Sequence, residues 1–311
     1  MLRLNQKVYV VDIGGKLMEL RVLRYFQAVV QNRNISRAAL QLHVSQPTIS
    51  RQLHDLEEEL GITLFDRGSR TIKLTDSGEY FSNQVNQILA LTDKTLANIH
   101  EDQDIRGNIV IGSSEARSFL NIAQSFTGLQ KKYPHIHLDV ISTNADQIRT
   151  SIKSGYYDFG VIMEPGDKTD YDFMRLPGES RWGLLVSNHS PLATRDHIEL
   201  ADLANERLLI SGQHGMLEQL NDWLGGNATK LNVVATYTLL YNASLMVSAG
   251  MGSALCLDGI INTNQSDLVF VPFQPRLTSG TSLVWYHGQH HSAAAEAFLR
   301  QPSSDIGQPL P

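Results

Sequence analysis

The first hundred residues alternate apolar and polar positions with the three- to four-residue spacing of helices. In the first such segment Leu20, Leu23, Phe26 and Val30 fall on one face. This spacing indicates amphipathic helices that pack around a shared apolar core. The expected helices cover residues 18–30, 34–42, 45–60 and 75–99.

Residues with strong capping preferences mark the ends of these helices. Asn34 or Ser36 is suited to cap the second helix, and Ser45 the third. Pro47 falls in the first turn of the third helix, where its missing N–H costs nothing. Gly61 is expected to end that helix.

A short hairpin is expected between the third and fourth helices. Residues 62–65 and 71–74 are its two strands, and the tip between them carries Arg67 and Arg70. Two helices joined by a tight turn and followed by such a hairpin are typical of a winged helix-turn-helix.

The fourth helix is too long to belong to the small domain alone. Phe81, Val85, Ile88, Thr92 and Leu96 recur along it at alternating steps of four and three. That spacing is typical of a seam against a partner helix. We therefore expect Phe81, Val85, Ile88 and Leu96 to mediate dimerisation.

From residue 107 onward, apolar strand-like runs alternate with helical stretches. This alternation predicts an α/β architecture with largely parallel sheets. The expected strands include residues 109–111, 138–141, 159–162, 183–186, 207–210, 233–235 and 253–255.

Composition narrows the class of protein. With 311 residues, 42% hydrophobic and 19% charged, the chain suits two or three globular domains. Its single cysteine, Cys256, excludes an internal disulfide framework and suits a reducing cytosol. No apolar run approaches the ~20 residues that a membrane span needs, and residues 8–13 are too short and polar for a signal peptide. We expect a cytoplasmic protein without a membrane partner.

The third helix carries the chemistry of DNA recognition. Gln46 can bond adenine and Arg51 guanine in the major groove, while hydroxyls and helix-start N–H groups suit phosphates. Residues 18–80 hold eight Lys/Arg and eight Asp/Glu, so positive charge must gather locally. The candidate DNA-binding residues are Arg37, Ser45, Gln46, Pro47, Thr48, Ser50, Arg51, Arg67, Arg70 and Lys73.

Five segments carry a family resemblance. They are NISRAA (34–39), LHVSQPTIS (42–50), LEEELG (56–61), LFDR (64–67) and LTDSG (74–78). They resemble the signature of the LysR-type transcriptional regulators, specifically over about 60 residues and more coarsely from 18 to about 301.

The resemblance implies a bacterial regulator with a mainly α winged helix-turn-helix, a long dimerising linker helix and a two-lobed α/β effector domain like type 2 periplasmic binding proteins. It also implies homodimers that often pair into tetramers, an interrupted palindromic operator in double-stranded DNA, and RNA polymerase as a partner. The expected boundaries are an extension at 1–17, the DNA-binding domain at 18–75, the linker at 76–104, lobe I at 105–178 and 285–303, lobe II at 179–284, and a tail at 304–311.

Polar residues follow three expected strands and predict a ligand cleft. In α/β folds ligands bind beyond the carboxyl ends of strands. Hydroxyls and helix-start N–H groups favour a small anion or polar metabolite, whereas Glu115 and Glu164 would repel a carboxylate or prefer an amine. The alternative at each position is a simple cap or turn role. The candidates are Ser113, Ser114, Thr143, Asn144, Met163 and Glu164, with Ser211 and Tyr241 added by the resemblance.

The function expected is sequence-specific transcription regulation controlled by a small effector of unknown identity between the lobes. One alternative is a regulator that responds to a protein partner. Another is a solute-binding protein or enzyme on the same two-lobed fold. We expect no enzyme and no cofactor, because no nucleophile–base constellation, P-loop, GxSxG or HExxH is present.

Three further features are better explained by ordinary structural roles than by functional sites. Cys256 lies in an apolar run and is expected to be a buried thiol rather than a redox sensor. His287, His290 and His291 favour a solvated loop over a metal site. His43, in the helix–helix turn, is expected to be structural or to neighbour a phosphate.

Overall fold

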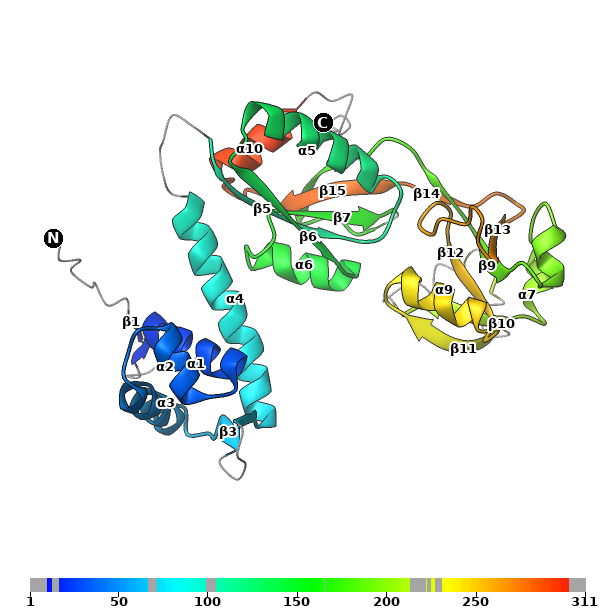
Figure 1. Ribbon diagram of the computed structural model, residues 1–311. Coiled ribbons are helices and arrows are strands. Elements are labelled where there is room, and N and C mark those ends of the chain that lie inside the picture. Colours follow the sequence, from blue (N-terminus) through cyan, green and yellow to red (C-terminus); the bar gives the residue numbers. More distant parts are fainter. Residues whose placement is uncertain are drawn as a thin grey trace. The chain divides into compact units, whose positions relative to one another are not determined.

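The computed structural model describes residues 10–12, 17–66, 72–98, 105–164, 166–212, 222, 225–226 and 231–301. The chain divides into two units, Met1–Leu96 and Ala97–Pro311 (Figure 1). Each unit has its own hydrophobic core.

The first unit is a helical domain with a small hairpin. The order of helices and strands matches the winged helix-turn-helix expected from the sequence. Its elements are β1 (Val10–Asp12), β2 (Leu17–Glu19), α1 (Leu20–Asn32), α2 (Ile35–Gln41), α3 (Gln46–Leu60), β3 (Phe65–Asp66), β4 (Lys73–Leu74) and α4 (Asp76–Asn98). β3 pairs antiparallel with β4, and β1 pairs antiparallel with β2.

The helix ends follow the predicted caps. Asn34, rather than Ser36, caps α2 by accepting a hydrogen bond from the Arg37 N–H at 3.0 Å. Ser45 caps α3 through the Thr48 N–H, and Gly61 ends α3 with a φ of 67°. His43 makes the turn between α2 and α3 with a φ of 55°, and its side chain is exposed.

The core of the first unit draws on all four helices. Phe26 is fully buried, with its ring centroid 5.2 Å from that of Phe65 and 5.0 Å from that of Phe81. Val85 and Leu89 of α4 are each 1% exposed in the same core. α4 is therefore part of this domain at least as far as Leu89.

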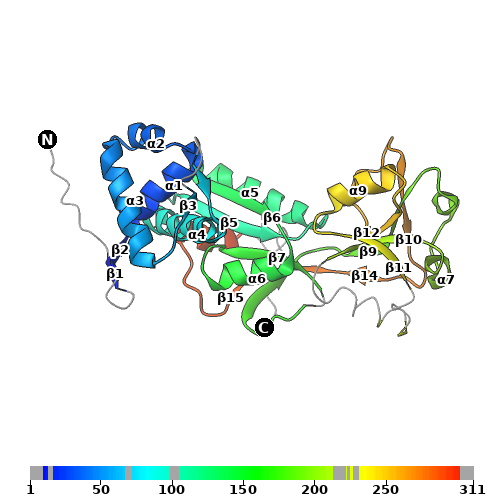
Figure 2. The ribbon, with the colours of Figure 1, turned by 90° about the horizontal axis from the view of Figure 1, so that it is seen from below.

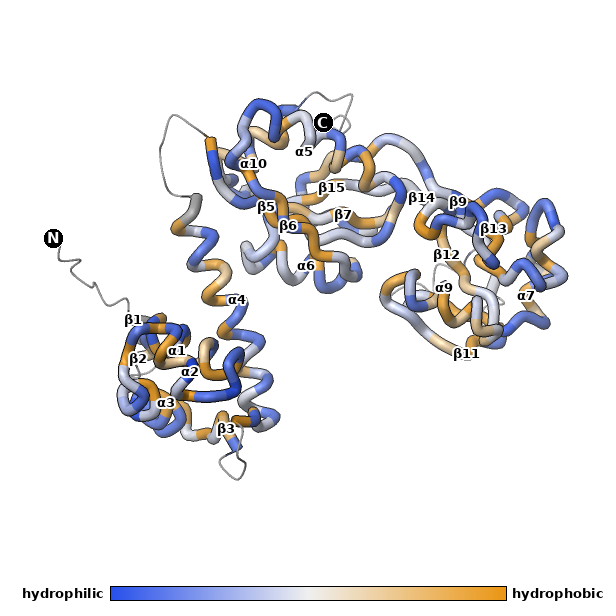
Figure 3. Tube along the Cα trace, in the orientation of Figure 1, coloured by the Kyte–Doolittle hydropathy of each residue, from blue (hydrophilic) through white to orange (hydrophobic). Residues whose placement is uncertain are grey.

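This packing corrects two of the predicted dimerisation residues. Val85 is buried and Phe81 partly buried within their own domain, so neither is available to a partner helix. Ile88, Leu91 and Leu96 are 38%, 37% and 58% exposed. At about 100° per residue, Ile88 and Leu91 stand to one side of Val85, whereas Leu96 is in line with Val85 about three turns further along α4. Figure 3 shows apolar and polar residues alternating along this helix.

Lobe I of the second unit is a five-stranded sheet with the strand order β6-β5-β7-β15-β8. Its side chains alternate between two cores: Ile109 and Ile111 face α5 and α10, whereas Val110 faces α6. Figures 1 and 2 show α5 and α6 on opposite sides of the sheet. The elements are β5 (Gly107–Ser113), α5 (Phe119–Lys132), β6 (Ile136–Ser142), α6 (Ala145–Lys153), β7 (Phe159–Met163), β8 (Tyr171–Arg175), β15 (Thr281–Tyr286) and α10 (Ala293–Leu299).

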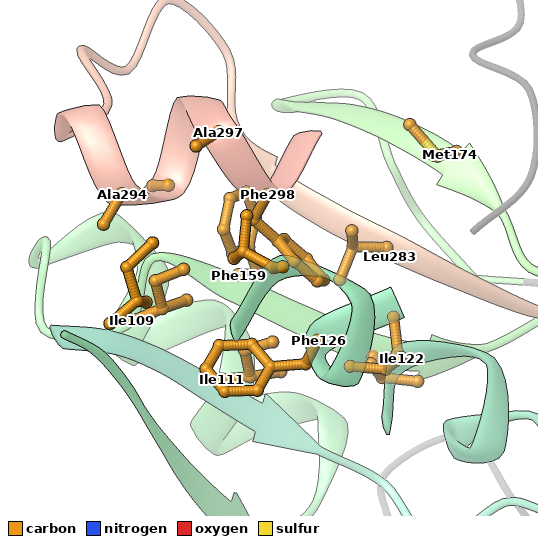
Figure 4. Close-up of a cluster of buried hydrophobic side chains, with 14 of the residues drawn as sticks. Ile109, Ile111, Ile122, Phe126, Phe159, Met174, Leu283, Ala294, Ala297 and Phe298 are labelled. Atoms are coloured by element: carbon orange, nitrogen blue, oxygen red, sulfur yellow. The ribbon is translucent and has the colours of Figure 1, made fainter. Parts of the chain in front are cut away.

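The larger of these cores lies under α5 and α10. Figure 4 shows Phe298 of α10 beside Phe159, and Phe126 of α5 beside Ile111. The Phe159 and Phe298 ring centroids are 5.5 Å apart. Such burial fixes β5 and β7, and with them the residues at their carboxyl ends.

Lobe II is built on a second sheet, with the strand order β11-β10-β12-β9-β13, and β14 pairs with β9. α9 covers one face through Ala243 and Val247, and residues of η1 and α7 cover the other. The elements are β9 (Ser180–Ser187), η1 (Pro191–Thr194), α7 (Leu200–Leu203), β10 (Arg207–Ser211), β11 (Asn232–Tyr237), α9 (Leu240–Ser248), β12 (Ser253–Leu257), β13 (Leu268–Pro272) and β14 (Thr278–Ser279).

All seven predicted strands are present, but the sheets are mixed rather than largely parallel. β15 runs antiparallel to β7 and β8, and β9 runs antiparallel to β12 and β13. The chain re-enters the lobe I sheet at Thr281, earlier than the predicted boundary at 285.

Candidate DNA-binding surface and ligand cleft

The face of α3 that was predicted to bind DNA is open to solvent. All of the described candidate residues are exposed: Arg37, Ser45, Gln46, Pro47, Thr48, Ser50, Arg51 and Lys73. The opposite face of α3 is held in the core by Ile49, Leu53 and Leu56. The amphipathic pattern of α3 therefore projects these polar side chains outward.

Arg51 is the most prominent cation on this helix. Its side chain is 84% exposed, and Nε lies 3.8 Å from the Asp55 carboxylate one turn along. This exposed ion pair is weak, so the guanidinium can exchange Asp55 for the edge of a base at little cost. Ser45 and Thr48 instead hydrogen-bond each other at 2.7 Å and fix the first turn of α3.

A groove of about 700 Å³ runs between α3 and the wing. Gln46, Ser50, Arg51 and His54 line it from α3, and Phe65 and Asp66 from β3. The predicted wing residues Arg67 and Arg70 lie outside the described residues. Lys73 of β4 is exposed and supplies positive charge beside this groove.

Glu57 has a role that the sequence did not reveal. It stands in an acidic run with Glu58 and Glu59, but its side chain is buried. Its Oε1 accepts hydrogen bonds from the N–H groups of Leu64 at 2.7 Å and Phe65 at 3.1 Å. Glu57 thus ties the wing to the recognition helix.

The second candidate site is a small cavity of about 50 Å³ between the two lobes of the second unit. Five of the predicted ligand residues line it, from strand ends and helix starts. They are Ser114, Thr143, Asn144, Met163 and Ser211. Asn144 also caps α6, accepting a hydrogen bond from the Gln147 N–H at 2.9 Å.

Ser114 is the notable polar group in this cavity. The residue is 5% exposed, and its Oγ has no hydrogen-bond partner among the described residues. A buried hydroxyl without a partner costs free energy. Ser114 therefore offers a hydrogen bond that a molecule in the cavity would complete.

Glu115 spans the cavity from lobe I to lobe II. Its Oε2 accepts a hydrogen bond from the Leu240 N–H at 2.5 Å, at the first residue of α9. Leu239, the N-cap residue of α9, provides no side-chain cap. Glu115 therefore supplies from the opposite lobe the cap that α9 lacks.

Three predicted ligand residues, Ser113, Tyr241 and Glu164, do not line the cavity. Ser113 is buried and donates its hydroxyl to the Ser114 carbonyl. Tyr241 is 63% exposed on the surface of α9 and does not line the cavity. Tyr237 and Thr238 line it instead, at the end of β11, a position that sequence reasoning missed.

Glu164 belongs to a separate ion cluster in lobe I. Lys168 and Arg175 both contact its carboxylate, and the Ser282 hydroxyl donates to it at 2.6 Å. Burial raises the pKa of Glu164, but these hydrogen bonds and the Lys168 charge outweigh it and hold the pKa at about 2. Glu164 is therefore neutralised within the fold and is not a cleft residue.

Cys256 is buried, as predicted, and it also lines the cavity. Burial raises the pKa of its thiol to about 12, so the reactive thiolate is scarce near neutral pH. His287 and His290 are exposed, but His291 stacks on Phe159 and so departs from the predicted solvated loop. Among the described residues, no group of three or more His, Cys, Asp or Glu could hold a metal ion.

Two protein-family descriptions match the chain. The bacterial regulatory helix-turn-helix protein of the lysR family matches residues 20–79, and the LysR substrate binding domain matches residues 102–302. Together they cover both units. The chain belongs to the LysR family.

This LysR-family chain is similar to transcriptional regulators, and the similarity extends over nearly the whole length of both proteins. The uncharacterized HTH-type regulator YnfL of Escherichia coli K12 is 27% identical over 287 residues, which is 90% of this chain and 96% of YnfL. The Hca operon transcriptional activator HcaR of the same organism is 29% identical, covering 88% of this chain and 93% of HcaR.

Solved structures show the same fold. CbnR, a LysR family transcriptional regulator, superposes with a TM-score of 0.72 at 18% identity, over 94% of this chain and all of CbnR. Full-length CbnR complexed with its target DNA gives a TM-score of 0.68 at 20% identity, over 91% of this chain and 98% of CbnR. This LysR-family chain is thus a DNA-binding transcriptional regulator with an effector-binding domain. None of its described helices is long and apolar enough to cross a membrane.

Proposed function

We propose that the chain binds a specific operator through α3 and the wing, and that a small polar effector in the cavity between the lobes controls its response. The observation that carries the effector part is the buried Ser114 hydroxyl, which lines the cavity without a hydrogen-bond partner. A buried polar group of this kind is retained at a cost unless a ligand uses it.

The DNA-binding part rests on the exposed polar face of α3. Gln46 and Arg51 bond base edges, and the exposed Ser50 and Lys73 contact the phosphate backbone. The remaining predicted contacts, including Arg67 and Arg70 in the wing, are part of the same proposal. The protein would act in the cytoplasm, where the operator and RNA polymerase are found.

The active form would be a homodimer, able to pair into a tetramer, on an interrupted palindromic operator. Ile88, Leu91 and Leu96 are exposed apolar residues of α4, a helix that is packed into the DNA-binding domain at least as far as Leu89. A partner helix on these residues would set the separation of two recognition helices, and a palindrome mirrors such two-fold symmetry.

The operator part is tested with the full-length protein and a pool of random DNA duplexes. Repeated selection should enrich an interrupted palindrome. Enrichment without a shared sequence would contradict sequence-specific recognition.

The effector part is tested with Thr143→Val, which keeps the shape of the side chain, and with Ser114→Ala. Both variants should bind the selected operator normally in a gel shift and lose the transcriptional response to the physiological inducer. A normal response of both variants over a full inducer titration would contradict the proposal and favour control by a protein partner.

A further inference from the structure

The cavity between the lobes carries a carboxylate, and its position is fixed by the fold. Glu115 lines the cavity, and Oε2 is held by the Leu240 N–H at 2.5 Å. That hydrogen bond uses one of the two carboxylate oxygens. The half-buried carboxylate therefore lies in the wall of the cavity with its other oxygen left over for a ligand.

Among the described residues that line the cavity there is no lysine, arginine or histidine. The nearest cation in sequence, Arg117, is exposed, and its side chain lies against Gly259 outside the lining. None of the ion pairs among the described residues includes Glu115. The cavity thus presents a negative charge with no positive side chain of its own.

Glu164, an acid of the same lobe that lies outside the cavity, differs from Glu115 in its partners. Two cations, Lys168 and Arg175, contact it directly, and it does not line the cavity. The charge of Glu115 instead contributes, after burial and the Cys256 charge, to the raised pKa of Tyr237 on the cavity wall. The difference between the two acids points to a ligand that supplies the missing positive charge.

The lobe I wall of the cavity has the opposite preference. Ser114 offers its unpartnered hydroxyl, and Thr143 and Asn144 stand at the start of α6, whose N-terminal N–H groups favour a negative or acceptor group. A molecule that satisfies both sides needs a cationic donor and an acceptor separated by a few atoms. The cavity, at about 50 Å³, has room for only a small one.

We propose that the effector is a small amine-bearing molecule of the amino-acid type. This proposal rests on the function proposed above and specifies the chemical class of its effector. Its ammonium group donates to Glu115, and its carboxylate accepts hydrogen bonds from Ser114 and Thr143. Because Glu115 also caps α9, such a ligand joins a group of lobe I to the first turn of a lobe II helix.

The test measures thermal unfolding of the full-length protein with each of the common L-amino acids. Each amino acid is measured beside its deaminated acid and its decarboxylated amine, for example propionate and ethylamine for L-alanine. At least one amino acid should raise Tm, and its deaminated acid should not. Glu115→Gln should weaken binding of that amino acid by about 10- to 100-fold, as expected for one lost charged hydrogen bond.

Glu115→Gln keeps an oxygen that can accept the Leu240 N–H, so its ligand-free Tm should match the wild type. Glu179→Gln, an exposed glutamate that does not line the cavity, is the matched control and should bind normally. The proposal is overturned if no amino acid or amine binds, or if acids without an amine bind and Glu115→Gln strengthens them. In that second result Ser114→Ala would still abolish binding of the acid. The cleft would then be supported as the effector site, and only the proposed amino-acid class of the effector would be wrong.

Discussion

The Glu57 carboxylate in α3 accepts a hydrogen bond from the Leu64 N–H, 2.7 Å away, at the start of the wing. The same oxygen accepts the Phe65 N–H. Through these two bonds the recognition helix positions the first strand of the wing. Both N–H groups lie in a buried region, so no water is available to replace Glu57.

Glu57→Ala should lower the free energy of unfolding of the DNA-binding domain by about 2–4 kcal/mol, because two buried donors lose their acceptor. Urea denaturation followed by circular dichroism measures this. Glu58→Ala is the control, since the Glu58 side chain is 69% exposed and its contact with His54 lies on the surface. Equal effects of the two substitutions would show that the buried contact is unimportant.

Arg51→Ala should cost about 1–3 kcal/mol of binding to the selected operator and much less on random DNA, because a base-edge contact is lost. Lys73→Ala should weaken both to a similar extent and lower the slope of log K against log salt by about 1. Fluorescence anisotropy titrations at several salt concentrations distinguish the two. If both variants behave alike on specific and random DNA, the assigned roles are wrong.

Two neighbouring positions on α4, one buried and one exposed, should respond differently to a charge. Val85→Asp places a carboxylate in a core position that is 1% exposed, and it should destabilise the domain by about 3 kcal/mol or more. Ile88→Asp, at a position 38% exposed, should leave the domain folded and yield monomers. Sedimentation and circular dichroism of both variants test this. A folded Ile88→Asp dimer with normal operator binding would place the dimer seam elsewhere.

The free energy of unfolding should depend on pH through the ionisation of Glu164. Its pKa is about 2 in the folded protein, below the ordinary value of 4.5, so folding is favoured above pH 4.5 and the gain is lost as pH falls toward 2. The shift corresponds to about 3 kcal/mol near neutral pH. Glu164→Gln should lose about that much at pH 7 and half or less near pH 3, measured by denaturant unfolding. A difference from wild type that does not change with pH would contradict this.

The sequence predicted the elements well because their signals are local. Ser45, Pro47 and Gly61 determine where α3 begins and ends within a few residues of themselves. The antiparallel strand β15 was missed, since its placement beside β7 depends on a return of the chain from lobe II that no local pattern encodes.

The candidate sites were predicted unevenly for a related reason. An amphipathic pattern distinguishes inside from outside, so the exposed face of α3 followed from it. It does not tell how far along α4 the helix packs into its own domain, and Val85 was therefore assigned to a partner helix although it is buried within its own domain. Nor does it tell whether an acid such as Glu164 meets cations from distant strands, as it does here through Arg175 and Ser282.

The single continuous helix α4 fixes the angle between its buried and its exposed apolar residues. Val85 sets the angular position of the helix in the DNA-binding domain, and the exposed Ile88 follows three residues later, about 60° to one side. One residue inserted between them would turn Ile88 and the exposed residues after it by about 100° relative to the recognition helix, whereas four would turn them by only about 40°. The chain length of this segment is therefore under a phase constraint: whatever packs on these exposed residues meets α3 at an angle fixed by the residue count.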